Sequence, residues 1–286
     1  MTRPSIGVFD SGVGGLSVLR EIRRRLPNEP LVYFADQRHV PYGSRSLDAV
    51  RALSEGITRL LLEQECELVV VACNTASAAA LRALRSIFPG TPFVGMEPAV
   101  KPAAERTETR KVAVLATPAT FQGVLFSSVV DRFARGVDMV EIVAPGLVEL
   151  IEAGHTASEE VDSILQQSLS PAADQGIDTL VLACTHYSFV IPSIQRILGS
   201  AVTVIDPAPA IARQTERLWE NRGREQSTQK GADTQPGADT LEGTGTRFIT
   251  SGDPRAFRSS LFKLVGVEGD AEPASWETGS LVLRGN

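Results

Sequence analysis

Short apolar runs alternate with segments of helical periodicity along most of the chain. Seven runs have the length and apolar content of buried strands, namely residues 5–9, 31–35, 68–72, 111–116, 137–143, 179–183 and 201–205. Between them, apolar residues recur three or four positions apart, as in residues 16–26, 53–61 and 161–169. This alternation predicts an α/β fold, with central parallel sheets and crossover helices.

Helix starts can be placed from local residue choices. Ser46 precedes the periodic segment 53–61 and predicts an N-cap. Thr156, with Glu159 three residues later, has the spacing of a capping box and predicts a helix that begins there. Residues 76–87 favour a third helix directly after the strand at 68–72.

Two parts of the sequence match one another. Residues 68–77, LVVVACNTAS, align with residues 179–188, TLVLACTHYS, and this places Cys73 and Cys184 at the same point after similar strands. A weaker match aligns residues 6–11 with 112–117. Any two buried parallel strands look alike, so the shared cysteine position carries the inference. We expect two similar halves.

Length and composition exclude several classes of protein. The 286 residues are enough for about two domains. With 43% hydrophobic and 22% charged residues, the composition excludes collagen-like, disordered and coiled-coil chains. Asp10 interrupts the apolar run near the N-terminus, so we expect no signal peptide, no membrane partner and a cytoplasmic location. The net charge of −6 argues against nucleic acid as the main partner.

The cysteines, histidines and lysines give no pattern typical of a cofactor site. Cys66, Cys73 and Cys184 are odd in number and far apart, which argues against a disulfide framework. No metal is expected, because the histidines lack ligand spacing, and we interpret His39 and His155 as surface-loop residues. No lysine occupies a position typical of a pyridoxal phosphate Schiff base: Lys101, Lys111, Lys230 and Lys263.

Residues 221–246 differ in composition from their surroundings. The segment is polar and rich in glycine, and the sequence GADT at residue 231 recurs at residue 237. Such a segment has too little apolar surface to offset the entropy of ordering it. We therefore predict a flexible surface insertion with no part in function.

Two cysteines lie where an α/β sheet binds its ligands. Cys73 follows a predicted strand and precedes Asn74 and Thr75, and Cys184 repeats this arrangement before Thr185 and His186. A single such cysteine is usually a small core residue, but two in matching positions favour chemistry. Two thiols across a cleft suit a symmetric reaction, in which one removes a proton and the other supplies one to the opposite face. That reaction is racemisation.

The glycine-rich segment 9–15, FDSGVGG, allows an alternative hypothesis. It nearly matches the dinucleotide fingerprint, and Asp36 follows where an acidic residue would bind a ribose. A nucleotide-dependent dehydrogenase or a non-catalytic nucleotide binder is therefore the competing class. Against it, Asp10 would place a negative charge beside the pyrophosphate.

Five motifs together resemble those of bacterial glutamate racemases. They are DSGVGGLS at 10–17, VPYG at 40–43, ACNTAS at 72–77, ACTHY at 183–187 and SGDP at 251–254. The resemblance implies cofactor-independent interconversion of L- and D-glutamate, which supplies D-glutamate for peptidoglycan, commonly by a homodimer. It also implies two α/β domains related by pseudo-twofold symmetry, with the active site in the cleft between them. The first would comprise residues 1–98 and 207–286, and the second residues 99–206.

The resemblance also implies roles for individual residues. Cys73 resembles the thiol that deprotonates D-glutamate and Cys184 the thiol that deprotonates L-glutamate, assisted by Asp10 and His186 respectively. The α-amino-acid head would be held by Asn74, Thr75 and Thr185. The side-chain carboxylate would lie among Ser11, Tyr42, Gly43, Thr117 and Thr120. Glu152 is similar to a family glutamate near the amino group, with Glu149 one turn away as the alternative.

The chemistry of these groups agrees with such roles. A thiolate is a weak base for an α-proton, so donors that stabilise the developing enediolate and exclusion of water are both needed. An imidazolium at His186 would lower the pKa of a nearby thiol, whereas the charge of Asp10 would raise the pKa of Cys73. We therefore expect Asp10 to handle a proton or orient a group.

The sequence departs from the family pattern at a few positions. Ala183 and Ser188 stand where the family often has Gly and Pro, and the insertion before Arg247 is unusually long. These differences affect loop geometry more than chemistry. The nearest alternative within this chemistry is a related racemase or decarboxylase that acts on aspartate, a hydantoin or an arylmalonate.

Overall fold

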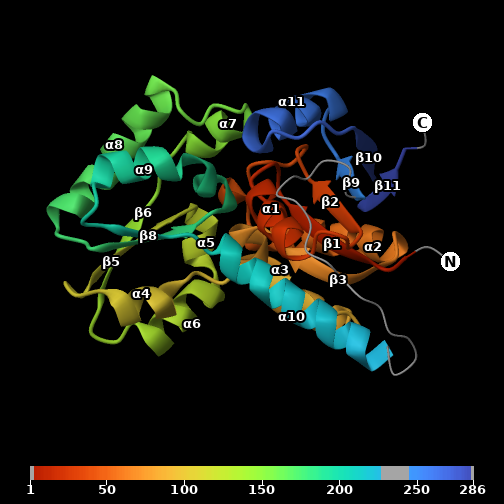
Figure 1. The fold of residues 1–286 in the computed structure, drawn as a ribbon, viewed down its shortest axis with the longest axis horizontal. Helices are drawn as coiled ribbons and strands as arrows, with labels where there is room; N and C mark the ends of the chain where they lie inside the picture. The colour runs from red at the N-terminus through yellow and green to blue at the C-terminus, as the bar shows by residue number, and fades with distance from the viewer. Residues whose placement is uncertain (1–2, 227–244, 285–286) are drawn as a thin grey trace.

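The strands of the molecule form two separate sheets. The computed structural model describes residues 3–226 and 245–284. A seven-stranded sheet has the order β11-β10-β9-β2-β1-β3-β4, and a four-stranded sheet has the order β6-β5-β7-β8. The two sheets lie in different halves of the molecule, each covered by helices (Figure 1). The predicted α/β fold is therefore confirmed.

The strands alternate with helices along the chain, and every strand pair is parallel except the antiparallel pair of β10 and β11. The strands are β1 (Ser5–Asp10), β2 (Leu31–Ala35), β3 (Cys66–Val71), β4 (Phe93–Gly95), β5 (Lys111–Ala116), β6 (Asp138–Ile142), β7 (Thr179–Ala183), β8 (Thr203–Ile205), β9 (Thr246–Thr250), β10 (Ala271–Glu277) and β11 (Ser280–Leu283).

Helices follow most of the strands, as the crossover connections between parallel strands require. They are α1 (Leu16–Arg25), η1 (Tyr42–Ser44), α2 (Leu47–Glu63), α3 (Asn74–Ile87), α4 (Val100–Arg106), α5 (Pro118–Gln122), α6 (Val124–Phe133), α7 (Leu147–Glu152), α8 (Glu159–Asp174), η2 (Thr185–Val190), α9 (Ile191–Leu198), α10 (Ala208–Gln226) and α11 (Pro254–Val265). Of these, η1 and η2 are 3₁₀-helices.

The internal sequence match reflects a repeated topology. The order β2-β1-β3-β4 in the larger sheet equals the order β6-β5-β7-β8 in the smaller one. The matched segments are β3 with β7 and β1 with β5, which therefore hold equivalent places in their sheets. Cys73 and Cys184 consequently follow equivalent strands, β3 in the larger sheet and β7 in the smaller one.

All seven predicted strands are present, with ends shifted by up to two residues. β4, β9, β10 and β11 were not predicted as strands. β4 has only three residues, and the alternation of β10 is obscured because it contains Pro273 and charged residues at Glu272 and Glu277. Short or edge strands of this kind give a weak periodic signal.

One predicted helix start is correct and another is wrong. Ser46 caps α2, and its hydroxyl accepts the Ala49 N–H at 3.3 Å. The next predicted cap, Thr156, is not used, because Ser158 lies two residues later and accepts the Val161 N–H at 3.3 Å. That hydroxyl satisfies a free N–H of the first turn, so α8 begins at Glu159.

The predicted insertion at 221–246 begins too early. α10 continues through Gln226, so the first residues of that segment are helical. Arg222 on this helix donates to the Glu67 carboxylate at 2.7 Å and to the Glu67 carbonyl at 2.8 Å, which links α10 to β3. The predicted insertion also ends too late, because Thr246 is the first residue of β9. Residues 227–244, on which most of this prediction falls, lie outside the described residues.

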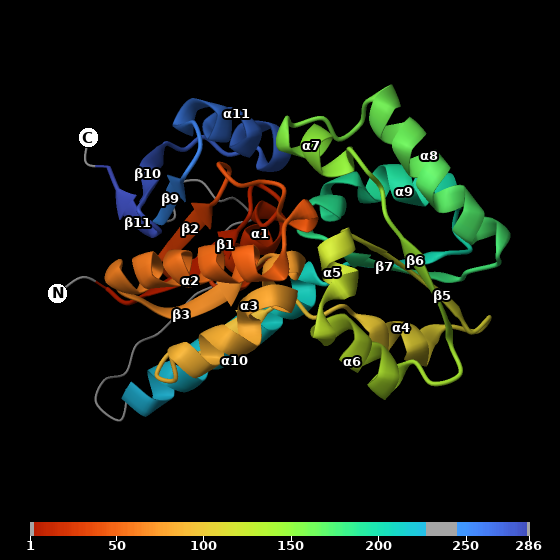
Figure 2. The ribbon, with the colours of Figure 1, turned by 180° about the vertical axis from the view of Figure 1, so that it is seen from behind.

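Side chains of the larger sheet alternate between two helical layers. Ile6 and Val8 of β1 belong to a core cluster with α1, whereas Phe9 belongs to a second cluster with α2 and α3. Seen from behind, α2 and α3 cover the sheet on this second side (Figure 2). α10 packs along α1 on the other side.

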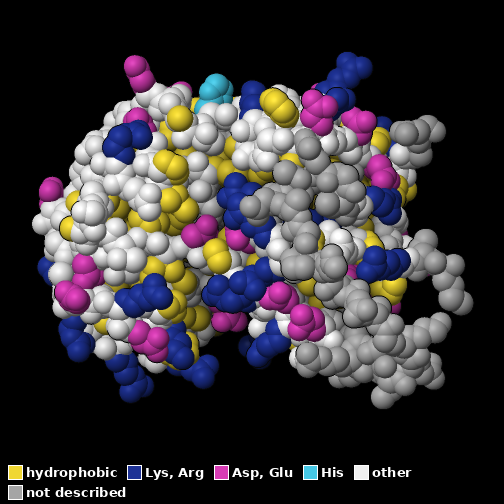
Figure 3. Space-filling model, in the orientation of Figure 1, with side chains coloured by type: hydrophobic (Ala, Val, Ile, Leu, Met, Phe, Trp, Pro, Cys, Tyr) yellow, Lys and Arg dark blue, Asp and Glu magenta, His cyan; other side chains and the backbone are white. Residues whose placement is uncertain are grey.

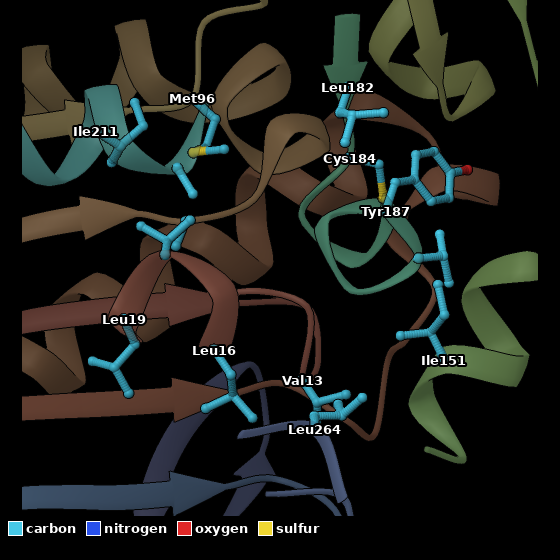
Figure 4. Packing of buried hydrophobic residues seen from close by; sticks show 14 of the residues in the cluster. Val13, Leu16, Leu19, Met96, Ile151, Leu182, Cys184, Tyr187, Ile211 and Leu264 are labelled. Carbon is cyan, nitrogen blue, oxygen red and sulfur yellow. The ribbon is translucent and has the colours of Figure 1, made fainter. Parts of the chain in front are cut away.

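One core cluster continues from the larger sheet into the smaller one. It contains Leu16 and Leu19 of α1 together with Ile151 of α7 and Tyr187 of η2. Figure 4 shows Cys184 and Tyr187 on the segment that follows β7, in the same cluster as Val13. Shared apolar burial therefore connects the two halves at the place where the matched cysteine segments end.

The surface carries charges of both signs. Lys and Arg side chains are interspersed with Asp and Glu on the face shown in Figure 3. Arg25 of α1 and Glu216 of α10 form one exposed ion pair at 2.7 Å. Among the described helices, none is long and apolar enough to cross a membrane.

The buried guanidinium of Arg23 predicts a test of stability. It donates to the carbonyls of Leu26, Pro27 and Glu29 and, at 2.8 Å, to Thr246 Oγ1, and so joins the end of α1 to β9. Arg23→Met leaves these acceptors without a donor and should lower the free energy of unfolding by about 3 kcal/mol. Arg258→Met, which breaks an exposed pair with Asp270, should change it by less than about 0.5 kcal/mol. Urea unfolding would measure both, and equal effects would contradict the prediction.

Candidate active site

A cavity lined mostly by buried residues lies between the two halves, at the carboxyl ends of β1, β3, β5 and β7. Residues that follow each of these strands line it: Ser11, Cys73, Asn74, Thr75, Thr117, Cys184, Thr185 and His186. Pro41, Tyr42, Gly43 and Val148 complete the lining. The structure therefore brings together most of the predicted site residues. Asp10, Thr120 and Glu152 are not in the lining and instead contact residues that are.

The two cavity thiols have the same backbone setting. Cys73 precedes α3 with φ −142° and ψ 121°, and Cys184 precedes η2 with φ −150° and ψ 130°. Each therefore ends a strand in extended conformation and presents its side chain beside the N–H groups of a helix start. The helix after Cys73 is an α-helix, whereas a 3₁₀-helix follows Cys184 before α9 begins. Cys66, by contrast, is a buried core residue, and its Sγ accepts the Ser5 hydroxyl at 3.3 Å.

A chain of contacts connects Cys184 to a carboxylate. Cys184 Sγ lies 3.6 Å from His186 Nδ1, and His186 Nε2 lies 2.6 Å from Glu152 Oε1. Burial lowers the pKa of His186, but its contacts with Cys184 and Glu152 outweigh burial and raise the pKa well above the usual value. These contacts therefore favour the cationic form of the His186 imidazole beside Cys184. Glu149 is exposed, so Glu152 is the glutamate of α7 that faces the site.

The side chains of Glu152 and His186 pack against the glycine-rich turn, which belongs to the other half of the molecule. The Val13 N–H donates to Glu152 Oε1 at 2.7 Å, and Tyr33 Oη donates to the Gly12 carbonyl at 2.7 Å. A Cβ at Gly12 would lie 1.9 Å from Glu152 Oε1, and one at Gly14 would lie 2.5 Å from His186 Nδ1. Glycine is therefore needed here for close approach of side chains.

The dinucleotide hypothesis does not fit this arrangement. Glu152 and His186 occupy the space beside the turn where a pyrophosphate would lie. Asp36, the candidate ribose ligand, is fully buried and hydrogen-bonded to protein side chains. The fingerprint-like spacing thus arises from the packing of a carboxylate and an imidazole against the turn.

Asp10 lies behind Cys73 in a fully buried position. Its carboxylate accepts the Gly15 N–H at 2.7 Å and the Thr185 hydroxyl at 3.4 Å. Burial raises the pKa of Asp10, and the nearby charge of His186 opposes this shift. Burial is also the main cause that raises the pKa of Cys73, and the charge of Asp10 raises it further, in the direction expected from the sequence.

Polar groups in the cavity are arranged for a polar ligand. Asn74 is buried, and neither its Nδ2 nor its Oδ1 has a hydrogen-bond partner in the protein. Such unpaired groups are costly unless a ligand or water satisfies them. The hydroxyls of Thr75, Thr117 and Thr120 lie 2.9–3.3 Å from one another and cluster beside the same cavity.

Several residues at the site were missed or misjudged. Val148 and Pro41 line the cavity without having been predicted. Val148 lies four residues before Glu152 on α7, so helical spacing could have indicated it. His39 is not a simple surface-loop residue, because it is half-buried and lies 3.0 Å from the Asp36 carboxylate. His155 is exposed, as predicted.

No group of three or more His, Cys, Asp or Glu that could hold a metal ion occurs within residues 3–226 and 245–284. The cavity therefore presents thiols, hydroxyls, an amide and an imidazole–carboxylate pair as its reactive groups. These groups can transfer protons and hold carboxylates and amino groups.

Comparisons with known proteins agree on one family. A family model described as Asp/Glu/Hydantoin racemase matches residues 6–215. A glutamate racemase of Roseiflexus sp. (strain RS-1) is 47% identical over 261 residues, which cover 91% of each chain.

Solved structures of similar fold include two with glutamate bound. The Francisella tularensis glutamate racemase in complex with D-glutamate has 28% identity and a TM-score of 0.78, over 95% of this chain and 97% of that one. The Escherichia coli glutamate racemase in complex with L-glutamate and the activator UDP-MurNAc-Ala has 30% identity and a TM-score of 0.79, over 99% and 100%.

The contact between His186 and Glu152 predicts a measurable pKa change. Glu152→Gln removes the negative charge and the charged hydrogen bond that raise the imidazole pKa, while burial, which lowers it, remains. The pKa of His186 should therefore fall in this variant. Glu149→Gln changes an exposed residue on the same helix and should leave it unaltered. NMR titration of the three histidines would measure this, and an unchanged His186 in Glu152→Gln would refute the coupling.

Proposed function

Since this chain belongs to the Asp/Glu/hydantoin racemase family, we propose that it interconverts L- and D-glutamate without a cofactor, by proton transfer at the α-carbon between Cys73 and Cys184. The observation that carries the proposal is that two thiols from matched segments line one cavity, each at the junction of a strand and a helix. A symmetric pair of this kind suits a reaction whose substrate and product are mirror images.

The proton transfer needs two thiols in opposite states. One cysteine, as thiolate, takes the α-proton from one face of the substrate, and the C–H electron pair moves into an enediolate. The other cysteine, as thiol, gives its proton to the opposite face and becomes a thiolate. We assign Cys73 to D-glutamate and Cys184 to L-glutamate. The free enzyme then exchanges protons with solvent before a substrate of the same hand can react again.

Stabilisation of the enediolate is the main energetic requirement of the reaction, because an α-proton is far less acidic than a thiol. Backbone N–H groups at the starts of α3 and η2 face the cavity end of each strand and supply donors. Asn74, with its amide unpaired in the protein, would bind the α-amino-acid head together with Thr75 and Thr185. Burial excludes water and strengthens each of these interactions.

The two thiols would be assisted in different ways. The imidazolium of His186, held by Glu152, would stabilise the thiolate form of Cys184. Asp10 raises the pKa of Cys73 instead, so we assign it to proton handling beside that thiol. Glu152 would in addition lie near the substrate amino group.

The side-chain carboxylate of glutamate would lie among hydroxyl and backbone donors. Ser11, Tyr42 and Gly43 form one wall, and Thr75 and Thr117, whose hydroxyls both contact that of Thr120, form another. Bound D- and L-glutamate in structures of similar fold support this substrate over aspartate or a hydantoin. D-glutamate made in this way would serve peptidoglycan synthesis.

Three further features belong to the proposal. We divide the chain into a first domain of residues 1–98 and 207–286 and a second of residues 99–206, because each sheet takes its strands from one of these parts. We also expect a homodimer, on the grounds of family resemblance, and a cytoplasmic location, on the grounds of the sequence.

Circular dichroism of L- and D-glutamate, followed separately, tests the activity. Both signals should decay to zero with the purified protein, since the enantiomers have equal free energy in water. Cys73→Ala and Cys184→Ala should each lower kcat/KM by about 10³-fold or more for both enantiomers. In D₂O, newly formed product should carry deuterium at the α-carbon while the remaining substrate does not.

Cys66→Ala is the matched control, because this third thiol is buried outside the cavity. It should retain wild-type kcat/KM. Full activity in either cavity-cysteine variant, or early deuterium in the remaining substrate, would exclude the two-thiol mechanism. A wild-type protein that stays inactive under reducing conditions, both alone and with the activator UDP-MurNAc-Ala found in the Escherichia coli structure, would exclude glutamate as its substrate.

Asp10→Asn separates proton handling from packing. The amide is nearly the same size but carries no charge and no transferable proton, so kcat should fall by about 10²-fold in both directions. The pKa of Cys73 should also fall, because the charge of Asp10 contributes to raising it. The pH dependence of alkylation in a Cys184→Ala background would measure that pKa. Unchanged rates in both directions would contradict the assignment.

A further inference from the structure

The carboxylate of Asp36 lies fully buried behind the cavity wall and holds side chains from three segments of the chain. Asp36 follows β2, and its own N–H donates to the Asp10 carbonyl at 3.0 Å. Its carboxylate accepts hydrogen bonds from Tyr42 Oη at 2.6 Å, Ser251 Oγ at 2.6 Å and Trp276 Nε1 at 2.9 Å. His39 Nδ1 lies 3.0 Å from the same group.

These partners include residues that the proposed reaction leaves unexplained. Ser251 is the first residue of the SGDP motif, and its hydroxyl also accepts the Arg38 N–H at 3.1 Å. Trp276 belongs to β10 near the end of the chain, and its ring packs edge-on against His39 with ring centroids 5.5 Å apart. The loop between Asp36 and α2 is therefore tied at two points to the C-terminal part of the larger sheet.

The same loop forms one wall of the cavity. Pro41, Tyr42 and Gly43 line it, yet the Tyr42 hydroxyl points to Asp36. On the opposite side the loop meets the smaller sheet, where a Cβ on Gly43 would lie 2.6 Å from Thr117 Cβ. The wall thus has little room to shift while Asp36 and Thr117 hold its two sides.

The Asp36 carboxylate is well suited to hold several donors at once. Burial alone would raise its pKa, but hydrogen bonds from His39, Ser251, Tyr42 and Trp276 outweigh burial and lower it. An ionised carboxylate has two oxygens that only accept, which matches this set of donors. An asparagine at position 36 would offer only one accepting oxygen, and its NH₂ group, itself a donor, would face other donors.

We propose that Asp36 is a positioning residue that holds the Pro41–Gly43 wall where the substrate carboxylate binds, and that Ser251 and Trp276 act through it. This inference rests on the proposed glutamate racemase function. Within residues 3–226 and 245–284, the Asp36 carboxylate makes no hydrogen bond to the two thiols, His186 or Glu152; its partners are Tyr42, Ser251, Trp276 and His39. The wall would contact the substrate carboxylate equally in the bound substrate and in the transition state. Displacement of the wall should therefore raise KM more than it lowers kcat.

Steady-state kinetics of Asp36→Asn, Trp276→Phe and Ser251→Ala test the proposal. Asp36→Asn should raise KM about tenfold for both enantiomers while kcat stays within about threefold of wild type. Trp276→Phe keeps the ring but removes one donor, and Ser251→Ala removes another. Each should raise KM by about two- to fivefold. If Asp36→Asn does not fold, these two variants decide the question.

The chain offers matched controls for each change. Asp178 also accepts four hydrogen bonds, but it lies at the start of β7, the end away from the cavity, so Asp178→Asn should leave KM unchanged. Trp219 on α10 is the other tryptophan, and Trp219→Phe should likewise leave KM unchanged.

The outcomes separate this inference from the function on which it rests. Unchanged KM in folded Asp36→Asn, or a fall in kcat alone, would overturn the positioning role while the wild type still racemises glutamate. Equal increases of KM in Asp178→Asn would overturn it as well, since they would indicate a general effect of destabilisation. Inactivity of the wild type and of Trp219→Phe would overturn the proposed function and this inference together.

Discussion

Glu152 and His186 belong to the half of the molecule built on the smaller sheet, yet they pack against the backbone of the glycine-rich turn in the other half. The Val13 N–H donates to the carboxylate, and the turn can approach this closely because Gly12 and Gly14 have no Cβ. The contact joins the two halves beside Cys184 and sets the orientation of the imidazole. The surroundings of Cys184 therefore depend on glycines in the turn between β1 and α1, in the other half of the molecule.

Several ionisable groups lie in or beside the cavity, and burial makes each of them costly to ionise by itself. Burial raises the pKa of Asp10 and Cys73, whereas paired contacts raise the pKa of His186 in spite of burial. A low-dielectric site makes every such interaction stronger than in water. In the proposed mechanism, the same burial that makes a thiol weakly acidic would also strengthen the hydrogen bonds available to an enediolate. The different neighbours of Cys73 and Cys184 would then assist the two thiols in different ways.

Local sequence signals predicted much of this arrangement. The seven apolar runs became strands, and the matched cysteine segments took equivalent places in two sheets of the same order. The predictions failed where a choice depended on neighbours. Ser158 replaced Thr156 as the helix cap, because its hydroxyl reaches a free N–H of the first turn. His39 looked like a surface residue because its partner, Trp276, lies far along the chain.

By itself, the sequence determined the α/β class, the two-part repeat and the placement of Cys73 and Cys184 at strand ends, because strand burial and residue spacing are local properties. Only the tertiary structure decided that Glu152 and not Glu149 faces the site, and that Asp36 serves the cavity wall and not a nucleotide. The reason is physical: Val13 and Glu152 are 139 residues apart, and Asp36 and Trp276 are 240 apart. Such hydrogen bonds exist only once packing brings distant segments together.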